Sequence, residues 1–418
     1  MIWSELTTGI YPWDIHDEGI ENILDNLQNY AGNNAAYMLA LMHPEKRPLH
    51  ANYYPHNPVR KRYIAEDSRC YFTIHPECYQ DSVIKPLPSE RDFLKDTDWL
   101  DVFIKGLRKR GMKTGAEISH TPLDAYRARH EYPHLIQRDI YGNPPKWDIM
   151  SDQLLCWNAP EARAYVCAIA KDLATNYDLD MIQTCAAPYM VGEPSVHSLL
   201  RITLGGCFCK NCEREARAQG LDWDKITATV RMFADAFNVN TLEGKELKLL
   251  IAQGNSSATS FLLEYPELYD WLKFRQNSVT RFIKELSETI HAANPKIDFR
   301  LNTFCEESEL FGLSIRDVAP YVDSIRVMEY EEQTGDYEKV ANKAKWFMNV
   351  RRMAGEDKKI IAGIAPRHLA TPELIKLGIK QVGLGGADGL SYGFYDGASF
   401  ENLKAIHQGM EDLNVVIK

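Results

Sequence analysis

The sequence contains three short apolar runs near its C-terminal end, DSIRVM at 323–328, KIIAGI at 359–364 and GADGLSY at 386–392. Helical patterns at 337–353 and 372–377 separate them. A short continuous apolar run is typical of a strand that is buried on both faces, and alternation of such strands with helices is typical of a parallel sheet. This part of the chain therefore predicts three parallel strands that are joined by helices.

The same alternation extends toward the N-terminus. Five more apolar runs precede this stretch, at 9–12, 35–42, 113–118, 179–184 and 298–304. Further helical periodicity is found at 19–30, 99–110, 160–177, 268–293 and 400–413. Eight strands that alternate with helices predict an α/β fold of the (β/α)8 barrel type, the TIM barrel. We expect residues 1–418 to form a single barrel domain.

Two connections are longer than ordinary loops. Residues 44–96 follow the second strand, and residues 186–265 follow the fourth. Loops after the strands of a barrel lie on the face that carries the chemistry, so both are expected to be insertions on the catalytic face. Aromatic side chains of the first insertion either stack on sugar rings or pack the insertion against the barrel; they are Tyr53, Tyr54, Tyr63, Tyr71, Phe72 and Tyr79.

The charge balance limits the classes of partner. The chain has 48 Lys and Arg residues against 58 Asp and Glu residues, a formal net charge of -10. Binding along a phosphate backbone needs concentrated basic residues, so nucleic acid is excluded as a partner. No run reaches the roughly 18 apolar residues of a membrane span, and the first residues do not form an export signal. We expect a soluble cytoplasmic protein, or an exported one whose signal segment is absent from this sequence.

Three cysteines crowd into the segment CFCKNC at 207–212, where Cys207, Cys209 and Cys212 can converge on one ion. A tetrahedral zinc site needs a fourth ligand, and Cys156 follows the third strand on the same face of the barrel. Four sulfur ligands fill the coordination shell and leave no position for substrate, which predicts a structural zinc. Free thiols without a metal are the alternative.

At these cysteines the chain resembles the clan of (β/α)8 glycoside hydrolases that includes the family-42 β-galactosidases. In that family a cysteine after the third strand joins a Cys-x-Cys-x-x-Cys loop after the fourth strand to bind zinc, and Cys156 and residues 207–212 occupy the matching places. The strand order also matches along nearly the whole chain, from GIYP at 9–12 to GADGL at 386–390. The resemblance implies a barrel, a zinc site and a function on carbohydrates.

The chain departs from this clan at both catalytic positions. The clan carries its acid/base in an Asn-Glu pair at the end of strand four and its nucleophilic glutamate at the end of strand seven. Here the two strands end in QTCA at 183–186 and in IAGIAP at 361–366, so neither glutamate is present. The resemblance therefore supports a carbohydrate-related function, but it does not support the retaining mechanism of the clan.

Polar residues follow the ends of the predicted strands, where a barrel presents side chains to one cavity. Hydroxyl, amide, imidazole and charged groups in such a mouth can hydrogen-bond the hydroxyl groups of a saccharide substrate. The candidates for substrate binding are Asp14, His16, His43, His120, Gln183, Tyr189, Asn302, Tyr330, Arg367 and Tyr392.

Hydrolysis of a glycosidic bond needs one protonated carboxyl group for the leaving oxygen and one ionised carboxyl group to activate water or attack carbon. Glu329 and Glu117 are the first candidate pair. Glu329 ends an apolar strand, where partial burial suits a proton donor. Asp396 is the alternative partner, because glycines on both sides of its segment let the backbone approach a ligand closely. The leading hypothesis is a glycoside hydrolase.

Two other functions stay open. His16, His43 and His120 follow three neighbouring strands, and with Glu117 or Glu329 they could hold a divalent ion. Such a site would indicate a metal-dependent lyase, isomerase or epimerase that acts on a sugar. A barrel that binds saccharide without turnover is the third hypothesis. The sequence contains no fingerprint of an organic cofactor, and it leaves open whether the chain forms homo-oligomers.

Overall fold

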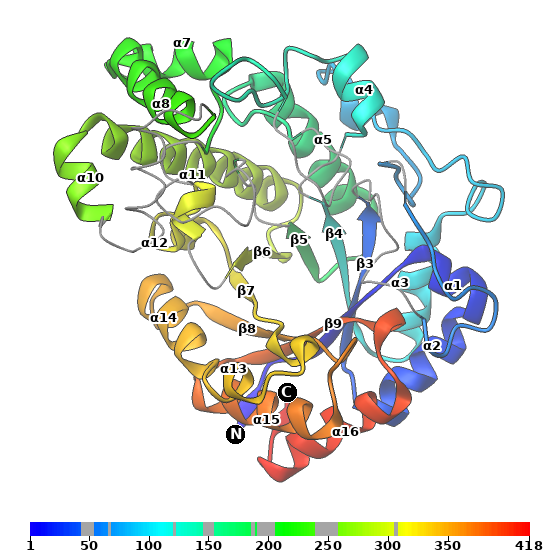
Figure 1. Cartoon of the computed structure of the whole chain (residues 1–418). Coiled ribbons are helices and arrows are strands. Elements are labelled where there is room, and N and C mark those ends of the chain that lie inside the picture. The colour runs from blue at the N-terminus through cyan, green and yellow to red at the C-terminus, as the bar shows by residue number, and fades with distance from the viewer. Residues whose placement is uncertain are drawn as a thin grey trace.

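A computed structural model describes residues 1–42, 54–65, 68–119, 123–144, 154–184, 189, 205–238, 258–304 and 308–418. Eight parallel strands form a closed barrel in chain order (Figure 1). This confirms the predicted (β/α)8 fold. The strands are β2 (Leu6–Ile10), β3 (Ala35–Leu41), β4 (Lys113–Ile118), β5 (Met181–Thr184), β6 (Asp298–Phe304), β7 (Ser324–Met328), β8 (Lys359–Ile364) and β9 (Gly389–Phe394).

The first and last barrel strands differ from their predicted bounds. The first strand ends at Ile10, because Pro12 begins helix α1 (Pro12–Glu18). Proline lacks an N–H group and is accommodated in the first turn of a helix, so the apolar character of this segment was misleading. The last strand begins at Gly389, since Gly386 has a φ of 72° in the turn before it.

Helices surround the barrel (Figure 1). Those that match a predicted pattern are α2 (Ile20–Asn26) with the π-helical turn η1 (Leu27–Ala31), α3 (Trp99–Lys109), α5 (Pro160–Asn176), α11 (Glu267–Ala293), α13 (Tyr337–Ala341), α14 (Ala344–Ala354), α15 (Pro372–Leu384) and α16 (Phe400–Asp412). Shorter or inserted helices are α4 (Ala125–His130), α7 (Lys210–Ala218), α8 (Trp223–Asn238), α10 (Ala258–Glu264) and α12 (Ile315–Val318). None of the described helices is long and apolar enough to cross a membrane.

Helix α15 is longer than the predicted range 372–377, because Gly378 continues it. A Cβ atom at Gly378 would lie 2.1 Å from Oε1 of Glu332, so the glycine makes room for that side chain. Glu332 is fully buried and pairs with the equally buried Lys343 at 2.5 Å. Lys343 also donates to the backbone carbonyl of Glu329 at 2.9 Å, so this ion pair holds the segment after β7 in place.

The two ends of the chain lie side by side (Figure 1). Strand β1 (Ile2–Trp3) pairs in parallel with β10 (Val416–Ile417), and the two form a small sheet outside the barrel. These two-residue strands were not predicted, since such short segments carry no periodicity. Because β1 precedes β2 and β10 follows α16, their pairing ties the start of the barrel to its last helix.

Charged side chains occupy part of the barrel interior. Arg300 of β6 is fully buried and donates to both carboxylate oxygens of Glu5, at 2.5 and 2.9 Å. The same guanidinium donates to Asp298 at 2.9 Å and to Ser324 at 2.8 Å. A buried charge is tolerated when its hydrogen bonds are satisfied in this way. The interior is thus polar near both ends, which distinguishes it from a purely aliphatic barrel core.

The described part of the first insertion is packed on the barrel by aromatic rings. Trp13 of α1 stacks on Tyr11 with 4.4 Å between ring centroids, and Tyr63 of the insertion contacts Trp13 at 4.5 Å. Four of the aromatic residues singled out from the sequence are buried, namely Tyr54, Tyr71, Phe72 and Tyr79. These rings pack the insertion against the barrel, while Tyr53 lies outside the described residues.

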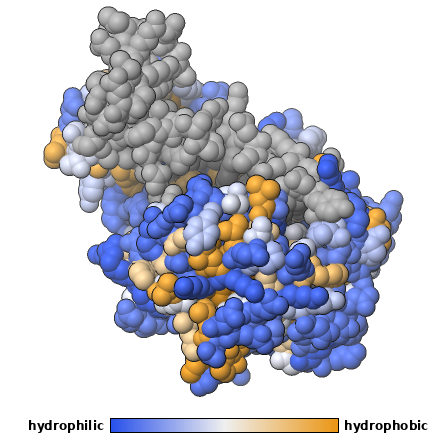
Figure 2. Space-filling model, turned by 60° about the horizontal axis from the view of Figure 1, so that its bottom comes forward, coloured by the Kyte–Doolittle hydropathy of each residue, from blue (hydrophilic) through white to orange (hydrophobic). Residues whose placement is uncertain are grey.

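One face of the molecule is shown as a space-filling view in Figure 2. Its described surface is mostly hydrophilic, with a band of hydrophobic residues. This distribution agrees with a barrel whose apolar side chains are used mainly in the core.

Candidate functional site

The ends of the barrel strands bring buried polar groups together. Tyr11 follows β2 and lies at the start of α1, where its backbone N–H donates to Oδ2 of Asp14 at 3.0 Å. This capping interaction fixes the carboxyl group of Asp14 inside the structure, where it is fully buried. Burial raises the pKa of Asp14 well above its usual range, and the charges of Asp396 and Glu18 raise it further.

Asp396 is a second carboxyl group of this region whose pKa is raised. It lies in the short helical turn η7 (Tyr395–Gly397) that follows β9, and it is fully buried. Burial raises its pKa to about 7, although the charges of Arg367 and His56 lower it. Among the described residues no side chain donates to either carboxylate oxygen, and the backbone N–H of Gly397 is the nearby donor that lowers the pKa. A buried carboxyl group that titrates near neutrality and is not paired with a charged side chain can carry a proton to a ligand.

The side chain of Glu117 is held by a residue of the adjacent strand. It lies in β4 directly opposite Gln183 of β5, and partners in parallel strands point to the same side of a sheet. The side-chain amide of Gln183 donates to Oε2 of Glu117. Glu117 is 5% exposed, and its charge reaches Arg326 and Tyr37 inside the barrel. A hydrogen-bond donor and a nearby guanidinium both favour the ionised form of a carboxyl group.

Two guanidinium groups flank one tyrosine at the ends of β7 and β8. Arg326 donates to Tyr330 Oη at 2.6 Å and to Ser391 Oγ at 2.7 Å, and more weakly to Asn302 Oδ1 at 3.5 Å. Arg367 lies over the other side of the network, with its Cζ atom 5.5 Å from the centroid of the Tyr330 ring. These contacts bring Asn302, Tyr330 and Arg367 together, as the sequence predicted for strand ends.

Tyr11 connects the two carboxyl groups. Burial raises the pKa of its phenol well above the usual range, and the charges of Asp396 and Glu117 raise it further, while Arg367 lowers it. The phenol is therefore within electrostatic reach of both carboxyl groups. Asp396 follows β9 and Tyr11 follows the adjacent strand β2. Glu117 lies near the end of β4, which is separated from β2 by β3. We call this group, together with Asp14 and Arg367, the mouth cluster.

Glu329 also lies at the end of its strand. It directly follows β7 and is 2% exposed. Its backbone carbonyl accepts a hydrogen bond from the buried Lys343. The structure thus places Glu329 beside Tyr330. Glu329 is not one of the residues that define the mouth cluster, whereas Glu117 and Asp396 are.

Three predicted binding residues lie elsewhere. His16 is on the exposed side of α1, 2.7 Å from Asp17 and against the rings of Phe93 and Trp99, because two residues after Asp14 a helix presents nearly its opposite face. Tyr392 points out of the barrel, where its hydroxyl donates to Asn33 at 2.7 Å. Its neighbour Ser391 is the inward residue, as alternation along a strand requires.

Tyr189 is the third such residue. Its hydroxyl accepts a hydrogen bond from Asn158 at 3.1 Å. Burial raises the pKa of this phenol well above its usual range, and the charges of Cys212 and Cys156 raise it further. Tyr189 therefore packs beside the cysteines, which the position of a loop residue alone could not indicate. His43 and His120, also predicted to bind substrate, lie outside the described residues.

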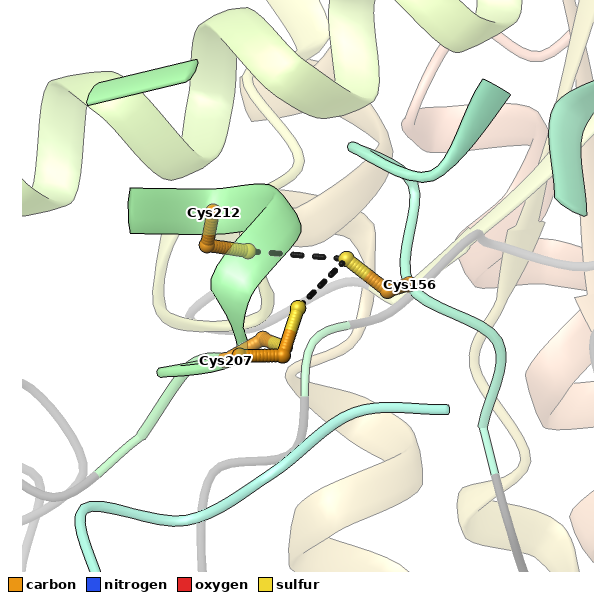
Figure 3. A group of neighbouring side chains, drawn as sticks. Cys156, Cys207 and Cys212 are labelled. Carbon is orange, nitrogen blue, oxygen red and sulfur yellow. Dashed lines mark hydrogen bonds between the residues drawn. The ribbon is translucent and has the colours of Figure 1, made fainter. Parts of the chain in front are cut away.

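The four predicted cysteines gather in one buried cluster (Figure 3). Their sulfur atoms all lie within 4.8 Å of one another. Cys156 Sγ is 3.5 Å from the sulfur atoms of both Cys209 and Cys212. Sulfur atoms at 2.3 Å from a tetrahedral zinc lie about 3.8 Å apart, so this arrangement fits a zinc ion. Among the described residues, these four are the group whose ligand atoms could hold a metal.

The segments that carry the cysteines are fixed by neighbours. Cys209 is the residue before helix α7, and Cys212 lies in its first turn. Asn158 donates from Nδ2 to the sulfur of Cys212 at 3.3 Å, and Arg281 of α11 donates to Oδ1 of Asn158 at 2.6 Å. Hydrogen bonds from neighbouring thiols lower the pKa of Cys209, so at least one sulfur is readily ionised. A second layer of this kind orients metal ligands.

Tyr11, Arg326 and His56 belong to this region but were not predicted as site residues. The inward position of Arg326 follows from alternation in β7, which was available from the sequence. His56 lies in the first insertion, and its Nε2 is 3.1 Å from the backbone carbonyl of Tyr395. No local pattern could have placed it there, since insertion and turn are more than 300 residues apart.

Comparisons with known proteins show the fold. Neither a protein-family model nor a curated protein matches the sequence. The PgaB (BpsB) glycoside hydrolase domain from Bordetella bronchiseptica superposes with a TM-score of 0.62 at 14% identity, with 99% of each chain covered. The catalytic domain of a β-amylase from Paenibacillus polymyxa has a TM-score of 0.56 at 10% identity, again with 99% of each chain covered.

A β-galactosidase from the psychrophilic Marinomonas ef1 has a TM-score of 0.56 at 11% identity. The match covers 98% of the present chain but 59% of the β-galactosidase. At such identities these similarities show a shared TIM-barrel architecture of the type found in glycoside hydrolases.

Proposed function

We propose that the chain is a carbohydrate-active enzyme that hydrolyses a glycosidic bond at the C-terminal mouth of the barrel. The observation that carries the proposal is the contrast between two buried carboxyl groups. Asp396 has a pKa of about 7 and, among the described residues, no side-chain donor on its oxygens, whereas Glu117 accepts from the side chain of Gln183 and lies near Arg326. Two carboxyl groups in contrasting environments are what acid and base roles require. The fold shared with glycoside hydrolases supports the same conclusion.

In this mechanism Asp396 is the proton donor. Its carboxyl proton passes to the glycosidic oxygen while the bond from that oxygen to the anomeric carbon breaks. Glu117 is the ionised partner, which takes a proton from a water molecule that attacks the anomeric carbon. The products are a free sugar and an alcohol or shortened glycan. The proton on Glu117 then returns through solvent to Asp396, which restores both groups. If the carboxyl groups of Asp396 and Glu117 lay closer together, Glu117 would attack the anomeric carbon directly instead of activating water.

Residues next to the mouth cluster position these groups. Gln183 holds Glu117 by its amide, and its own Oε1 is buried without a hydrogen-bond partner among the residues that the structure describes. That oxygen is available to accept a sugar hydroxyl. Arg326 and Tyr330 form a fixed pair beside Glu117, which supports the charge of the carboxylate. Glu329 is assigned the role of a substrate contact in this proposal, and not that of the proton donor.

The same proposal assigns a structural zinc to Cys156, Cys207, Cys209 and Cys212. Bound zinc would supply stability, because four thiolates fill its shell and tie two distant segments together. Four thiolates give such a centre a net charge of about -2. The guanidinium of Arg275 is fully buried, and its nitrogens have no hydrogen-bond partner within the described part of the chain. Its Cδ lies 2.8 Å from where a Cβ of Gly206 would be. This cation beside the loop of Cys207 supports an anionic centre.

In this account residues 1–418 form one barrel domain, and the insertions at 44–96 and 186–265 border the mouth. The contact of His56 with Tyr395 supports that position for the first insertion.

Release of reducing sugar from a panel of α- and β-linked glycans tests the proposal. The panel is incubated with the unmodified protein and with the variants Glu117→Gln and Asp396→Asn, whose folding is checked by circular dichroism. We expect release by the unmodified protein from at least one glycan and a loss of about 100-fold or more in each variant. Full activity in either folded variant would contradict the assigned roles.

A further inference from the structure

One histidine of the first insertion lies against the turn that carries Asp396. The side chain of His56 is 3% exposed. Its imidazole stacks on the ring of Phe400 in α16 with 5.0 Å between ring centroids, and its centroid is 4.3 Å from that of Tyr395. Tyr395 directly precedes Asp396 in η7. The imidazole is therefore packed between helix α16 and the turn of the proposed proton donor.

Hydrogen bonds connect His56 to this turn in a closed circuit. Its Nε2 donates to the backbone carbonyl of Tyr395 at 3.1 Å, and its Nδ1 is 3.1 Å from Oε1 of Glu18 in α1. The hydroxyl of Tyr395 donates to Oε2 of Glu18 at 2.8 Å. The circuit thus begins at the phenol of Tyr395 and returns to the carbonyl of the same residue. We call Glu18, His56 and Tyr395 the turn clamp.

The turn clamp indicates the charge of His56. A backbone carbonyl accepts hydrogen bonds but cannot donate one, so Nε2 must carry a proton. An ionised carboxylate cannot donate either, so the bond from Nδ1 to Glu18 requires a second proton on the ring. An imidazole that makes both bonds is an imidazolium. The side chain of Glu18 is 6% exposed, and a buried carboxylate favours a cation beside it.

His56 acts on Asp396 in two ways. The carbonyl of Tyr395 belongs to the peptide bond whose nitrogen is that of Asp396, so the bond from His56 fixes the backbone at the proton donor. The second way is electrostatic. Burial raises the pKa of Asp396, and the charges of Arg367 and His56 lower it. No described side chain donates to the carboxylate oxygens of Asp396, so His56 acts without direct contact.

Other charged and titratable groups surround Asp396. Glu18 of the turn clamp raises its pKa, whereas the guanidinium of Arg367 after β8 lowers it. Three further groups lie within electrostatic reach of Asp396, namely the carboxyl group of Asp14 and the phenols of Tyr11 and Tyr54. Arg367 belongs to the barrel, but His56 belongs to the first insertion. Part of the positive charge beside Asp396 is therefore present only when the insertion is docked.

A separate set of contacts holds the same segment of the insertion on α1. Asn57 donates from Nδ2 to Oδ2 of Asp17 at 3.0 Å, and Arg60 donates from Nη2 to Oδ1 of Asp17 at 2.7 Å. These bonds do not involve His56. A substitution of His56 therefore leaves other contacts that keep the insertion docked.

We propose that His56 is a positioning residue for Asp396: held as an imidazolium by Glu18, it fixes the backbone at Asp396 and places a positive charge beside that carboxyl group. The proposal rests on the proposed function for the role of Asp396 as a proton donor. The charge itself can be examined without turnover. The first insertion then contributes to the chemistry of the mouth as well as to its border.

Titration of the Asp396 carboxyl group by carbon NMR tests the charge, with Asp396→Asn used to identify its signal. His56→Gln removes the positive charge but keeps an amide that can donate to the carbonyl of Tyr395. We expect Asp396 to titrate about one pH unit higher in this variant, because a nearby cation favours the ionised form of a carboxyl group. His56→Lys keeps a positive charge and should keep the lower titration.

His75→Gln is the matched control. His75 belongs to the same insertion and also pairs with a buried carboxylate, that of Asp172 at 2.7 Å. This variant should leave the titration of Asp396 unchanged. Circular dichroism checks that each variant is folded.

Tyr395→Phe separates the backbone effect from the charge. It opens the turn clamp but keeps His56 and Glu18, so the titration of Asp396 should not move. We expect kcat on the glycoside that is cleaved fastest to fall about tenfold, because a misplaced catalytic group reacts more slowly. The decline of kcat/KM at alkaline pH should keep its position in Tyr395→Phe and should move upward in His56→Gln together with the NMR titration.

An unchanged titration of Asp396 in folded His56→Gln would overturn the proposal, and so would an equal shift in His75→Gln, His56→Lys or Tyr395→Phe. If the titration shifts as expected but the unmodified protein releases no product from any glycan, the proposed hydrolysis is contradicted and the charge of His56 beside Asp396 stands. If glycans are cleaved and the titration shifts while the kcat/KM profile does not, Asp396 is not the proton donor.

Discussion

The buried carboxyl group of Asp396 lies within electrostatic reach of the guanidinium of Arg367, yet the two groups share no hydrogen bond. An ion pair in direct contact would keep the carboxyl group ionised. Here the guanidinium lowers the pKa of Asp396 only in part, and burial keeps it at about 7. The absence of a direct hydrogen bond between them leaves the carboxyl group available to a ligand as a proton donor.

The pKa of Asp396 has a consequence for stability. Its value in the folded protein is above the ordinary 3.8. Both states are protonated at pH 3, and between about pH 4 and pH 7 the unfolded chain releases a proton that the folded chain retains. The free energy of unfolding therefore falls over this range, by about 4 kcal/mol from this one group, and the loss is complete above about pH 7.

The substitution Asp396→Asn should remove this pH-dependent loss of unfolding free energy. We expect the variant to be more stable than the unmodified protein at pH 8 and equally stable at pH 3, as measured by urea unfolding at both pH values. Asp25→Asn, at an exposed site of α2, serves as a control and should show no such difference. A variant that is destabilised equally at both pH values would show that Asp396 is not buried in its neutral form.

The two candidates for the proton donor are separated by parallel substitutions. Glu329→Gln should retain kcat within about tenfold, whereas Asp396→Asn should lose about 100-fold or more, because general acid catalysis contributes at least that much. Single-turnover kinetics on one cleaved glycoside provide the comparison. A larger loss in Glu329→Gln than in Asp396→Asn would exchange the roles proposed for the two residues.

The cysteine cluster predicts one zinc ion per chain. Replacing Asn158 by Ala should weaken zinc binding about 10- to 100-fold, since the residue donates a hydrogen bond to Cys212. Competition with a chromophoric chelator measures this affinity. Asn349→Ala on α14, which lies away from α7 (Figure 1), is the matched control and should leave the affinity unchanged. A chain that binds no zinc, or binds it equally tightly in both variants, would contradict this assignment.

The ion pair between Lys343 and Glu332 is expected to be important for stability. Both side chains are fully buried, so removal of one partner leaves an uncompensated charge. Lys343→Met should lower the free energy of unfolding by about 3 to 5 kcal/mol. Lys339→Met removes a long, exposed contact with Glu331 at 3.9 Å and should change it by less than about 1 kcal/mol. Equal effects in a urea titration would contradict the burial of the first pair.

Much of the fold could be predicted because the strands carry their signal locally. The runs at 113–118, 298–304 and 359–364 match β4, β6 and β8, since buried parallel strands need apolar residues at nearly every position. The ends were less certain where proline or glycine changes the backbone, as Pro12 does at α1. The four cysteines were found because their spacing in the sequence already brings three of them together.

The candidate site was predictable only as a set of strand ends. Glu117, Gln183 and Asp396 follow from that position alone. His16, Tyr189 and Tyr392 share it but point elsewhere, since the side that each faces depends on helical phase, strand alternation or loop packing. His56 of the first insertion contacts the backbone carbonyl of Tyr395, beside Asp396, and such a contact depends on tertiary packing that no local pattern records.

The dependence of kcat/KM on pH tests the central claim most directly, with the glycoside of the panel that is cleaved fastest. If Asp396 is the proton donor, kcat/KM should fall about tenfold per pH unit above about pH 7, as the carboxyl group of the free enzyme loses its proton. A value that stays constant between pH 7 and pH 9, in a protein that remains folded, would contradict the assignment of Asp396 and with it the proposed mechanism.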